Sequence, residues 1–185
     1  MRYLMIKKVK IEGERIYLKT LGKHDATKEY CSWLNDPVVN KYLETRDATI
    51  AGIEKYIKDK NKNPNCLFLG IFFKENQKHI GTIKLEPVDL KNCKATLGLL
   101  IGDKDYWGKG IGKEATALLV DYGFNKLKLK EVNLGVISDN KAAVRVYEKA
   151  GFKVEKINKK SVRHGSKLFD EIVMLIKNEN NKNKK

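Results

Sequence analysis

The sequence predicts a single α+β domain built on a mixed, mostly antiparallel sheet of about seven strands flanked by helices. Three observations support this fold class. Strand-like and helical segments alternate along 185 residues without an internal repeat, and that length suits one domain with a full core. The strand-like segments 79–85 and 95–101 are joined by a polar connection, which favours antiparallel pairing. The second of them leads into a glycine-rich loop and then a helix.

Apolar spacing predicts the elements of the first half. A strand is expected over 15–20, and the helix that follows has its apolar positions at Ala26, Tyr30, Trp33 and Leu34. Asp36 and Pro37 are expected to cap and open another helix, with inward-facing Val39, Tyr42 and Leu43. A short helix over 50–58 and a chain break at 63–65 then precede a buried strand over 66–73.

The second half continues the alternation. The helix after the glycine loop has an apolar inner face made of Ile111, Ala115, Leu118, Leu119 and Tyr122. A strand over 131–137 and a helix over 140–150 follow, with Gly151 as the C-terminal stop of that helix. Two last strands are expected near 152–156 and 169–176. The domain is therefore predicted to cover 1–176, and the polar residues 177–185 are predicted to be a disordered tail.

Composition limits the classes of partner and location. The net charge of +15 comes from lysines spread along the whole chain, and no basic stripe with interleaved aromatic residues predicts nucleic-acid binding. No apolar run is long enough to span a membrane, and the start of the chain is not typical of a secretory signal. Cys31, Cys66 and Cys93 are odd in number and widely spaced, which indicates neither a disulfide framework nor a zinc site. We expect a cytoplasmic protein.

The most specific local pattern is Trp107-Gly108-Lys109-Gly110-Ile111-Gly112-Lys113, at the start of a predicted helix. Glycines let backbone N–H groups approach a ligand closely, and a helix N-terminus adds unpaired donors and partial positive charge. The segment therefore predicts a site for a phosphate-bearing cofactor. It is not a Walker-type loop, because Trp107 and Glu114 stand where Gly and Ser or Thr are needed. Nor is it a dinucleotide fingerprint, because it reads G-x-G-x-G. Alone, it would also fit a plain connecting turn.

A second pattern lies about thirty residues downstream, where Asn140 and Tyr147 are seven positions apart in a predicted helix. Their spacing puts both on nearly the same face, two turns apart, where an amide and a phenol could address one ligand. The plainer alternative is that Asn140 is a helix cap and Tyr147 a core residue.

Together, the two patterns resemble the GNAT (GCN5-related) N-acetyltransferase family, in particular its branch resembling ribosomal-protein-alanine acetyltransferases. The resemblance extends from about residue 15 to 176. It is strongest over 106–112 and 140–152, and Trp33-Leu34-Asn35-Asp36-Pro37 is similar to the entry segment of that branch. It implies the GNAT fold and an enzyme that moves the acetyl group from acetyl-CoA directly to a primary amine, with no metal.

The resemblance also implies which residues bind acetyl-CoA. Backbone N–H groups over 108–113 would hold the pyrophosphate, and the strand backbone at 99–101 would pair with pantetheine. An amide after a local bulge would polarise the thioester carbonyl. The cofactor-binding residues so implied are Leu99, Leu100, Ile101, Gly108, Lys109, Gly110, Ile111, Gly112, Lys113 and Asn140.

For the chemistry, Tyr147 matches the family's usual general acid, a phenol that protonates the leaving thiolate. The base is less defined, because Thr96 stands where this branch often has a glutamate. Glu86 could serve directly or through water, or could be a solvated carboxylate at a strand end. Ala143 stands where many relatives carry serine, which leaves the acid role to Tyr147. These departures keep a second reading open, namely a CoA-binding GNAT module without turnover.

The acceptor is expected to be a small-molecule amine. By resemblance, a nucleotide-linked amino sugar is favoured, and a protein N-terminus, a polyamine or an aminoglycoside stay open. Glu44 could attract an ammonium group, and Arg46 or Arg163 a phosphate. The sequence predicts neither a nucleic-acid nor a membrane partner, and it leaves a homodimer open.

Overall fold

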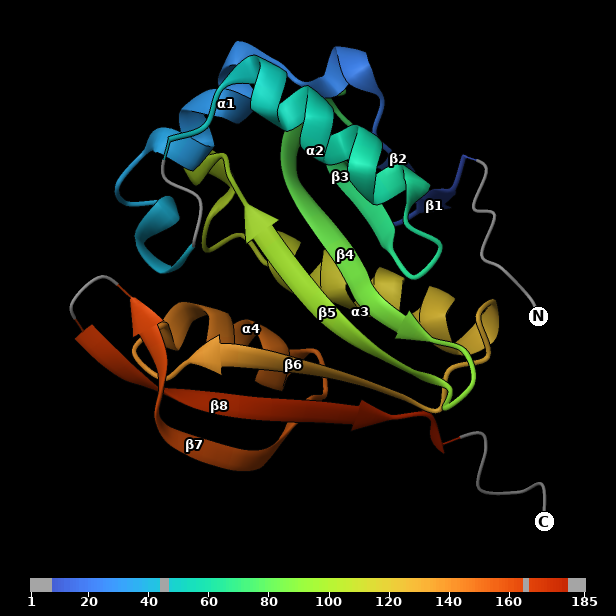
Figure 1. The fold of residues 1–185 in the computed structure, drawn as a ribbon. Coiled ribbons are helices and arrows are strands. Elements are labelled where there is room, and N and C mark those ends of the chain that lie inside the picture. The colour runs from blue at the N-terminus through green and yellow to red at the C-terminus, as the bar shows by residue number, and fades with distance from the viewer. Residues whose placement is uncertain (1–7, 44–46, 165–166, 180–185) are drawn as a thin grey trace.

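An eight-stranded sheet runs through the middle of the computed structural model, which describes residues 8–43, 47–164 and 167–179 (Figure 1). The spatial order is β1-β2-β3-β4-β5-β6-β8-β7, and every neighbouring pair is antiparallel except β5 and β6. The strands are β1 Lys10–Glu12, β2 Ile16–Thr20, β3 Leu67–Phe73, β4 His79–Asp89, β5 Lys94–Ile101, β6 Glu131–Ile137, β7 Lys153–His164 and β8 Lys167–Lys177.

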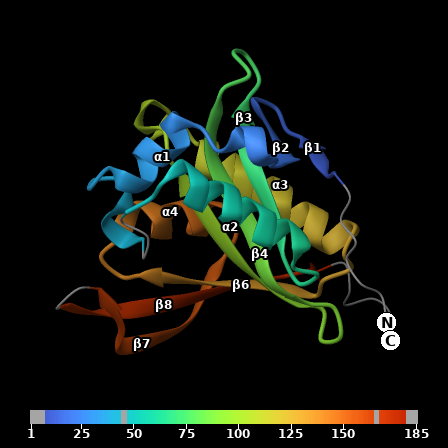
Figure 2. The ribbon, with the colours of Figure 1, turned by 45° about the horizontal axis from the view of Figure 1, so that its top comes forward.

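Four α-helices cover the two faces of this sheet (Figures 1 and 2). Helices α1 (Lys28–Asn35) and α2 (Ile50–Lys62) lie on one face, and α3 (Ile111–Asn125) and α4 (Lys141–Lys149) lie on the other. The start of α1 is capped by the Thr27 hydroxyl, which accepts a hydrogen bond from the Tyr30 N–H at 3.1 Å. The Thr49 hydroxyl caps α2 in the same way through the Gly52 N–H. These caps satisfy N–H groups that a helix start leaves unpaired.

Each pair of helices has its own hydrophobic core against the sheet. The core under α3 and α4 includes Leu97 of β5, Leu134 of β6, Leu119 of α3 and Tyr147 of α4. The core under α1 and α2 is richer in aromatic residues and includes Tyr17, Tyr30, Trp33, Phe68 and Phe72. Because side chains alternate along a strand, neighbouring residues of β5 belong to different cores.

The only parallel pair of the described sheet is also very short. Lys94–Thr96 of β5 pair with Glu131–Asn133 of β6, and no pairing continues beyond Thr96 and Asn133. There the Thr96 hydroxyl donates a hydrogen bond of 2.8 Å to the Asn133 side-chain oxygen. Past this fork, β5 and β6 separate, as Figure 1 shows. Beyond the fork, the facing edges of 97–101 and 134–137 have no strand pairing with each other, and we call the region between these two edges the slot.

The structure confirms the predicted fold class, with eight strands where about seven were expected. The additional strand is β1, which has only three residues and pairs with β2. The predicted antiparallel pairing of the segments that became β4 and β5 is confirmed, and the strand over 131–137 matches β6.

The helix expected after Asp36 does not form. The Asp36 carboxylate accepts hydrogen bonds from the Val38 and Val39 N–H groups, and only a single 3₁₀ turn, Asn40–Tyr42, follows. Asp36 itself ends α1. The Tyr42 hydroxyl instead donates a hydrogen bond of 3.2 Å to the Asp139 carbonyl at the start of the β6–α4 turn. This contact joins the segment after α1 to the end of β6.

The expected tail begins later than 177. Lys177 belongs to β8 and pairs with Glu131, and the Asn178 N–H donates to the Lys130 carbonyl at 2.8 Å. The last six residues, 180–185, lie outside the described residues.

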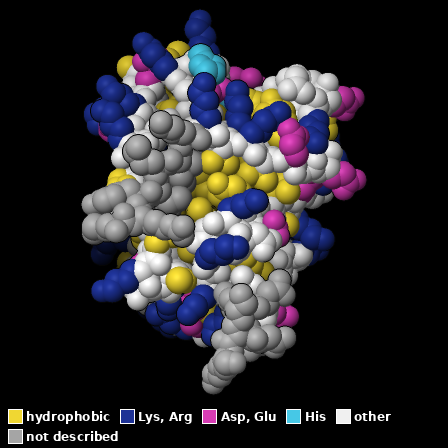
Figure 3. Space-filling model, turned by 90° about the vertical axis from the view of Figure 1, so that its right-hand side faces the viewer, with side chains coloured by type: hydrophobic (Ala, Val, Ile, Leu, Met, Phe, Trp, Pro, Cys, Tyr) yellow, Lys and Arg dark blue, Asp and Glu magenta, His cyan; other side chains and the backbone are white. Residues whose placement is uncertain are grey.

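The charged side chains are dispersed. On the face drawn in Figure 3, Lys and Arg side chains lie over the whole outline, with Asp, Glu and apolar side chains between them. This distribution agrees with lysines being scattered along the sequence rather than gathered in one stripe. In the described part of the chain, no helix has the length and apolar character needed to cross a membrane.

Candidate acetyl-CoA and amine site

The glycine loop presents an uninterrupted row of free N–H groups. Gly108 and Gly110 have positive φ angles of 71° and 79°, and Gly110 is the residue before the first turn of α3. Among the hydrogen bonds of the described residues, none has a backbone N–H between Gly108 and Lys113 as its donor. Six consecutive donors at a helix N-terminus form a site for an anion such as a pyrophosphate.

The loop is held from the neighbouring strand by Arg15, just before β2. The Arg15 guanidinium donates to the Lys109 carbonyl at 2.7 Å and to Glu114 of α3 at 3.0 Å. The Glu114 carboxylate also accepts the Arg15 N–H at 2.8 Å. These contacts fix the carbonyl of Lys109 toward Arg15 and join the loop to the first turn of α3. No local motif predicts this pair, because its partners lie 99 positions apart in the sequence.

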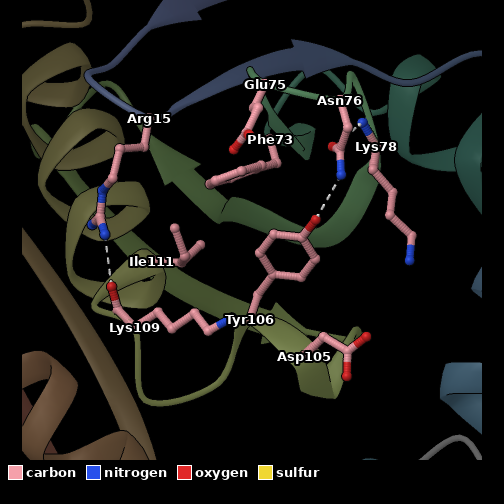
Figure 4. Close-up of a pocket in the computed structure, with 9 residues that line it drawn as sticks. All are labelled: Arg15, Phe73, Glu75, Asn76, Lys78, Asp105, Tyr106, Lys109 and Ile111. Atoms are coloured by element: carbon pink, nitrogen blue, oxygen red, sulfur yellow. Dashed lines mark hydrogen bonds between the residues drawn. The ribbon is translucent and has the colours of Figure 1, made fainter.

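A hollow of about 500 Å³ lies next to the loop, on the side of Arg15 and the β3–β4 hairpin (Figure 4). Tyr106 stands in it with its hydroxyl bonded to the Asn76 amide, and the Lys109 ammonium lies 5.8 Å from the centre of the Tyr106 ring. The Lys109 side chain therefore lines this hollow.

The slot between β5 and β6 begins where the loop and both covering helices meet. A Cβ atom placed on Gly112 of α3 would lie 3.3 Å from Val146 of α4 and 3.4 Å from Leu99 of β5. The predicted pantetheine-binding residues Leu99, Leu100 and Ile101 pair with β4 on one edge and with no strand on the other. The carbonyl of Ile101 accepts the Trp107 indole N–H at 2.8 Å, which ties the end of β5 to the glycine loop.

The β-bulge expected from the sequence beside the pantetheine-binding strand does not lie in β5 itself. The register between β4 and β5 shifts between Leu85 and Val88, so the additional residue lies in β4, at Glu86 and Pro87. It stands opposite Thr96, at the level of the fork. The expected role of an amide after the bulge stays a prediction.

Helix α4 carries the second predicted pair. The Asn140 side-chain oxygen accepts the Ala143 N–H at 3.2 Å, so Asn140 does cap the helix, and its amide nitrogen has no partner among the described residues. Tyr147 is 6% exposed and packs against Phe152. Burial raises the pKa of its phenol to about 12, and its hydroxyl makes no hydrogen bond to a described residue. A proton is therefore retained there at neutral pH and is not engaged elsewhere.

Glu86, the predicted candidate base, is held by cations. Its carboxylate accepts hydrogen bonds from the Lys60 ammonium at 2.5 and 2.6 Å, from Lys84 at 2.8 Å and from the Asn63 amide at 3.2 Å. Burial alone would raise the pKa of Glu86, but the bonds from Lys60 and Lys84 outweigh it and hold the pKa below its ordinary value. A carboxylate so stabilised in its charged form is a weak proton acceptor. These contacts favour a structural role for Glu86 over the role of catalytic base.

Of the predicted acceptor contacts Glu44, Arg46 and Arg163, the structure describes only Arg163. Arg163 is exposed near the end of β7, and Glu44 and Arg46 lie outside the described residues. Among the described residues, no group of three or more His, Cys, Asp and Glu side chains is placed to hold a metal ion.

Comparison with known proteins agrees with this geometry. A family model described as "Acetyltransferase (GNAT) domain" matches residues 15–153. The chain is 28% identical over 161 residues to an uncharacterized N-acetyltransferase, p20, of Bacillus licheniformis, covering 85% of this chain and 89% of that protein. It is 35% identical over 75 residues to spermidine N(1)-acetyltransferase of Escherichia coli K12, covering 40% of each chain.

Solved structures show the same fold. The spermidine N-acetyltransferase of Vibrio cholerae in complex with CoA and spermine superposes with a TM-score of 0.80 at 20% identity, covering 88% of this chain and 95% of that one. The ribosomal-protein-S5-alanine acetyltransferase of Vibrio fischeri superposes with a TM-score of 0.75 at 21% identity, covering 92% and 97%.

Proposed function

The chain belongs to the GNAT acetyltransferases and is an acetyl-CoA-dependent N-acetyltransferase, and we propose that it acetylates a small cationic primary amine, with a polyamine as the first candidate. One observation carries the acetyl-CoA part of this proposal: the slot between β5 and β6 begins beside six free N–H groups at the start of α3. An anion held at those groups and an extended chain held in that slot are parts of one elongated ligand.

The donor site fits acetyl-CoA, which supplies the acetyl thioester when bound. The N–H groups of 108–113 bind the pyrophosphate, and the free edge of β5 at Leu99 offers backbone partners to pantetheine. The Leu100 carbonyl instead points toward Gly81 of β4. The free amide nitrogen of Asn140 lies at the head of α4 and is available to the same ligand.

Tyr147 is proposed as the general acid. Its phenol keeps its proton at neutral pH, because burial raises its pKa to about 12, and it has no competing partner among the described residues. It gives that proton to the sulfur as the C–S bond breaks. Proximity of the two bound substrates supplies much of the rate enhancement.

For the acceptor, a polyamine is favoured because one similar protein is named a spermidine N(1)-acetyltransferase. The expected nucleotide-linked amino sugar finds no support in these relatives. We place the catalytic domain at residues up to Asn178, since Asn178 is still bonded to Lys130. A homodimer stays a prediction.

A thiol-release assay with acetyl-CoA tests the proposal. Spermidine, an aminoglycoside, a nucleotide-linked amino sugar and a peptide with a free N-terminus are offered as acceptors under one condition. We expect the fastest release with spermidine, and mass spectrometry should show one added acetyl group. Release only with another acceptor would overturn the polyamine assignment. No release with any, despite calorimetric binding of acetyl-CoA, would overturn the proposed turnover of these amines.

A further inference from the structure

Two glycines face each other across the slot, just past the fork. Gly98 of β5 and Gly135 of β6 each lie two residues beyond the register partners Thr96 and Asn133. Because side chains alternate along a strand, both glycines present the same sheet face as Thr96 and Asn133, opposite to α3 and α4. On this face, therefore, neither β5 nor β6 has a side chain at the positions of these two glycines. The Lys84 side chain of β4 lies over Gly98, since a Cβ atom placed there would be 3.2 Å from the Lys84 Cε. An acceptor would therefore approach a ligand in the slot from the side of Gly135.

A carboxylate lies over one of these glycines. Glu171 of β8 pairs with Ile137 and projects to the same face as Gly135. A Cβ atom placed on Gly135 would collide with the Glu171 Oε1, so that oxygen lies directly above the β6 backbone at the slot. The other oxygen, Oε2, accepts a hydrogen bond of 2.9 Å from the Asn158 amide of β7. This bond fixes the carboxylate in place.

Among the described residues, Glu171 differs from the neighbouring carboxylates because it has no cationic side chain as an ion-pair partner. On the opposite flank Glu86 is paired with two lysines, and the next residue in the chain, Asp170, is paired with Lys159. Within the described part of the chain, no Lys, Arg or His forms an ion pair with Glu171, and its Oε1 accepts no hydrogen bond. In a protein of net charge +15, a carboxylate left unpaired beside the slot is available to a cation from outside.

We propose that Glu171 holds the ammonium group of the acceptor and takes its first proton. This inference rests on the proposed function and names the residue that binds the amine. An ammonium group donates charge-assisted hydrogen bonds to a carboxylate, typically at about 2.8 Å. The ammonium group must also lose a proton before its nitrogen can attack the acetyl carbonyl carbon.

The protons balance across the two residues. One N–H proton goes to Glu171 and then to water. The nitrogen forms the C–N bond with the acetyl carbonyl carbon, the C–S bond breaks, and the sulfur takes the phenolic proton of Tyr147. The second N–H proton restores Tyr147. An ammonium and an acetyl thioester become an acetamide, a thiol and one released proton.

The test is Glu171→Gln, measured with the amine that the wild-type enzyme acetylates. Gln keeps an oxygen for Asn158 but has no charge. At pH 7 we expect kcat/KM for the amine to fall about 100-fold, with the Kd for acetyl-CoA changed less than about 2-fold. The defect should shrink as the pH approaches the pKa of the free amine, near 10, since a neutral amine needs neither the charge nor the proton acceptor. Glu171→Asp, which keeps the charge, should recover part of the activity.

Glu155→Gln is the matched control, because it makes the same change at an exposed position of the neighbouring strand β7, and it should leave kcat/KM unchanged. Wild-type kinetics in Glu171→Gln, or a defect that is the same at every pH, would overturn the role of Glu171 while the proposed function stands. A wild-type enzyme that acetylates no amine would instead contradict the proposed function. Thermal melting of each variant shows whether a loss comes from unfolding.

Discussion

The two sides of the slot are built in different ways. On the side of α3 and α4, the groups proposed to bind acetyl-CoA come from two short stretches, 108–113 and 140–147, and most of them are backbone N–H groups. On the side of α1 and α2, the polar groups near the slot come from α2, β4, β7 and β8, and all of them are side chains. The difference shows that the donor site is a local property of the sequence, whereas the acceptor site exists only after folding.

The two glutamates that flank the slot, Glu86 and Glu171, differ in their partners. Glu86 is neutralised by Lys60 and Lys84 and supports the contact between α2 and β4. Glu171 has one amide partner and keeps a free oxygen over Gly135. Their surroundings, rather than their residue type, decide which of them can receive a cationic amine.

The largest effect is expected from breaking the donor side at the glycine loop. Gly110→Glu would put a carboxylate among the N–H groups that bind the pyrophosphate, at a residue with φ of 79°. We expect the Kd for acetyl-CoA, measured by calorimetry, to rise at least about 100-fold, since like charges in contact cost several kcal/mol.

Gly110→Ala separates charge from backbone strain. It imposes the left-handed conformation on a residue with a Cβ, at a cost of about 1–2 kcal/mol, but adds no charge. Its Kd should rise by about 10-fold at most. Unchanged affinity in Gly110→Glu would remove the pyrophosphate from this loop.

Next in size is the proton donor. Tyr147→Phe removes only the hydroxyl from a buried ring, so we expect kcat to fall about 100-fold while the Kd for acetyl-CoA changes less than about 2-fold. Tyr122→Phe is the matched control, since Tyr122 lies on α3 and is partly exposed, and it should keep full activity. Equal turnover in wild type and Tyr147→Phe would exclude the acid role.

The same residue gives a pH expectation. Because burial raises the pKa of Tyr147 to about 12, its acid form persists as the pH rises and is lost only near that value. The kcat of the wild type should therefore show no decrease due to Tyr147 between pH 7 and 10. A decrease near pH 9 that disappears in Tyr147→Phe would contradict this.

The smallest effect on catalysis is expected on the acceptor side at Glu86. Glu86→Gln weakens the bonds to Lys60 and Lys84, so the free energy of unfolding should fall by about 1 kcal/mol, which lowers the melting temperature by about 2–4 °C. Activity should stay within about 3-fold. The pKa of Glu86 is lowered in the folded state, so its contribution is complete above its ordinary pKa of 4.5 and is lost as the pH falls through the folded value.

The difference in stability between wild type and Glu86→Gln should accordingly shrink below about pH 4. A 100-fold loss of kcat with an unchanged melting temperature would instead restore Glu86 as the catalytic base.

Local patterns allowed the elements around the proposed donor site to be predicted, because glycine positions and helix starts act over a few residues, while the roles of the site residues stay predictions. Strand β6 and the helix after the glycine loop were found for the same reason. Strand β1 was missed because three residues carry too little periodicity, and the helix after Asp36 was wrong because the Asp36 carboxylate satisfies Val38 and Val39 in a turn. The Arg15–Glu114 pair and the Glu171–Gly135 contact depend on register between distant strands, which no local spacing encodes.

The fork at Thr96 and Asn133 has a kinetic consequence. No strand pairing joins β5 and β6 beyond it, so on the proposed arrangement the donor is held from one face and the amine arrives from the other. Neither substrate has to leave before its partner enters. Turnover then passes through a ternary complex, with intersecting rather than parallel double-reciprocal plots, and CoA competes with acetyl-CoA without displacing the amine.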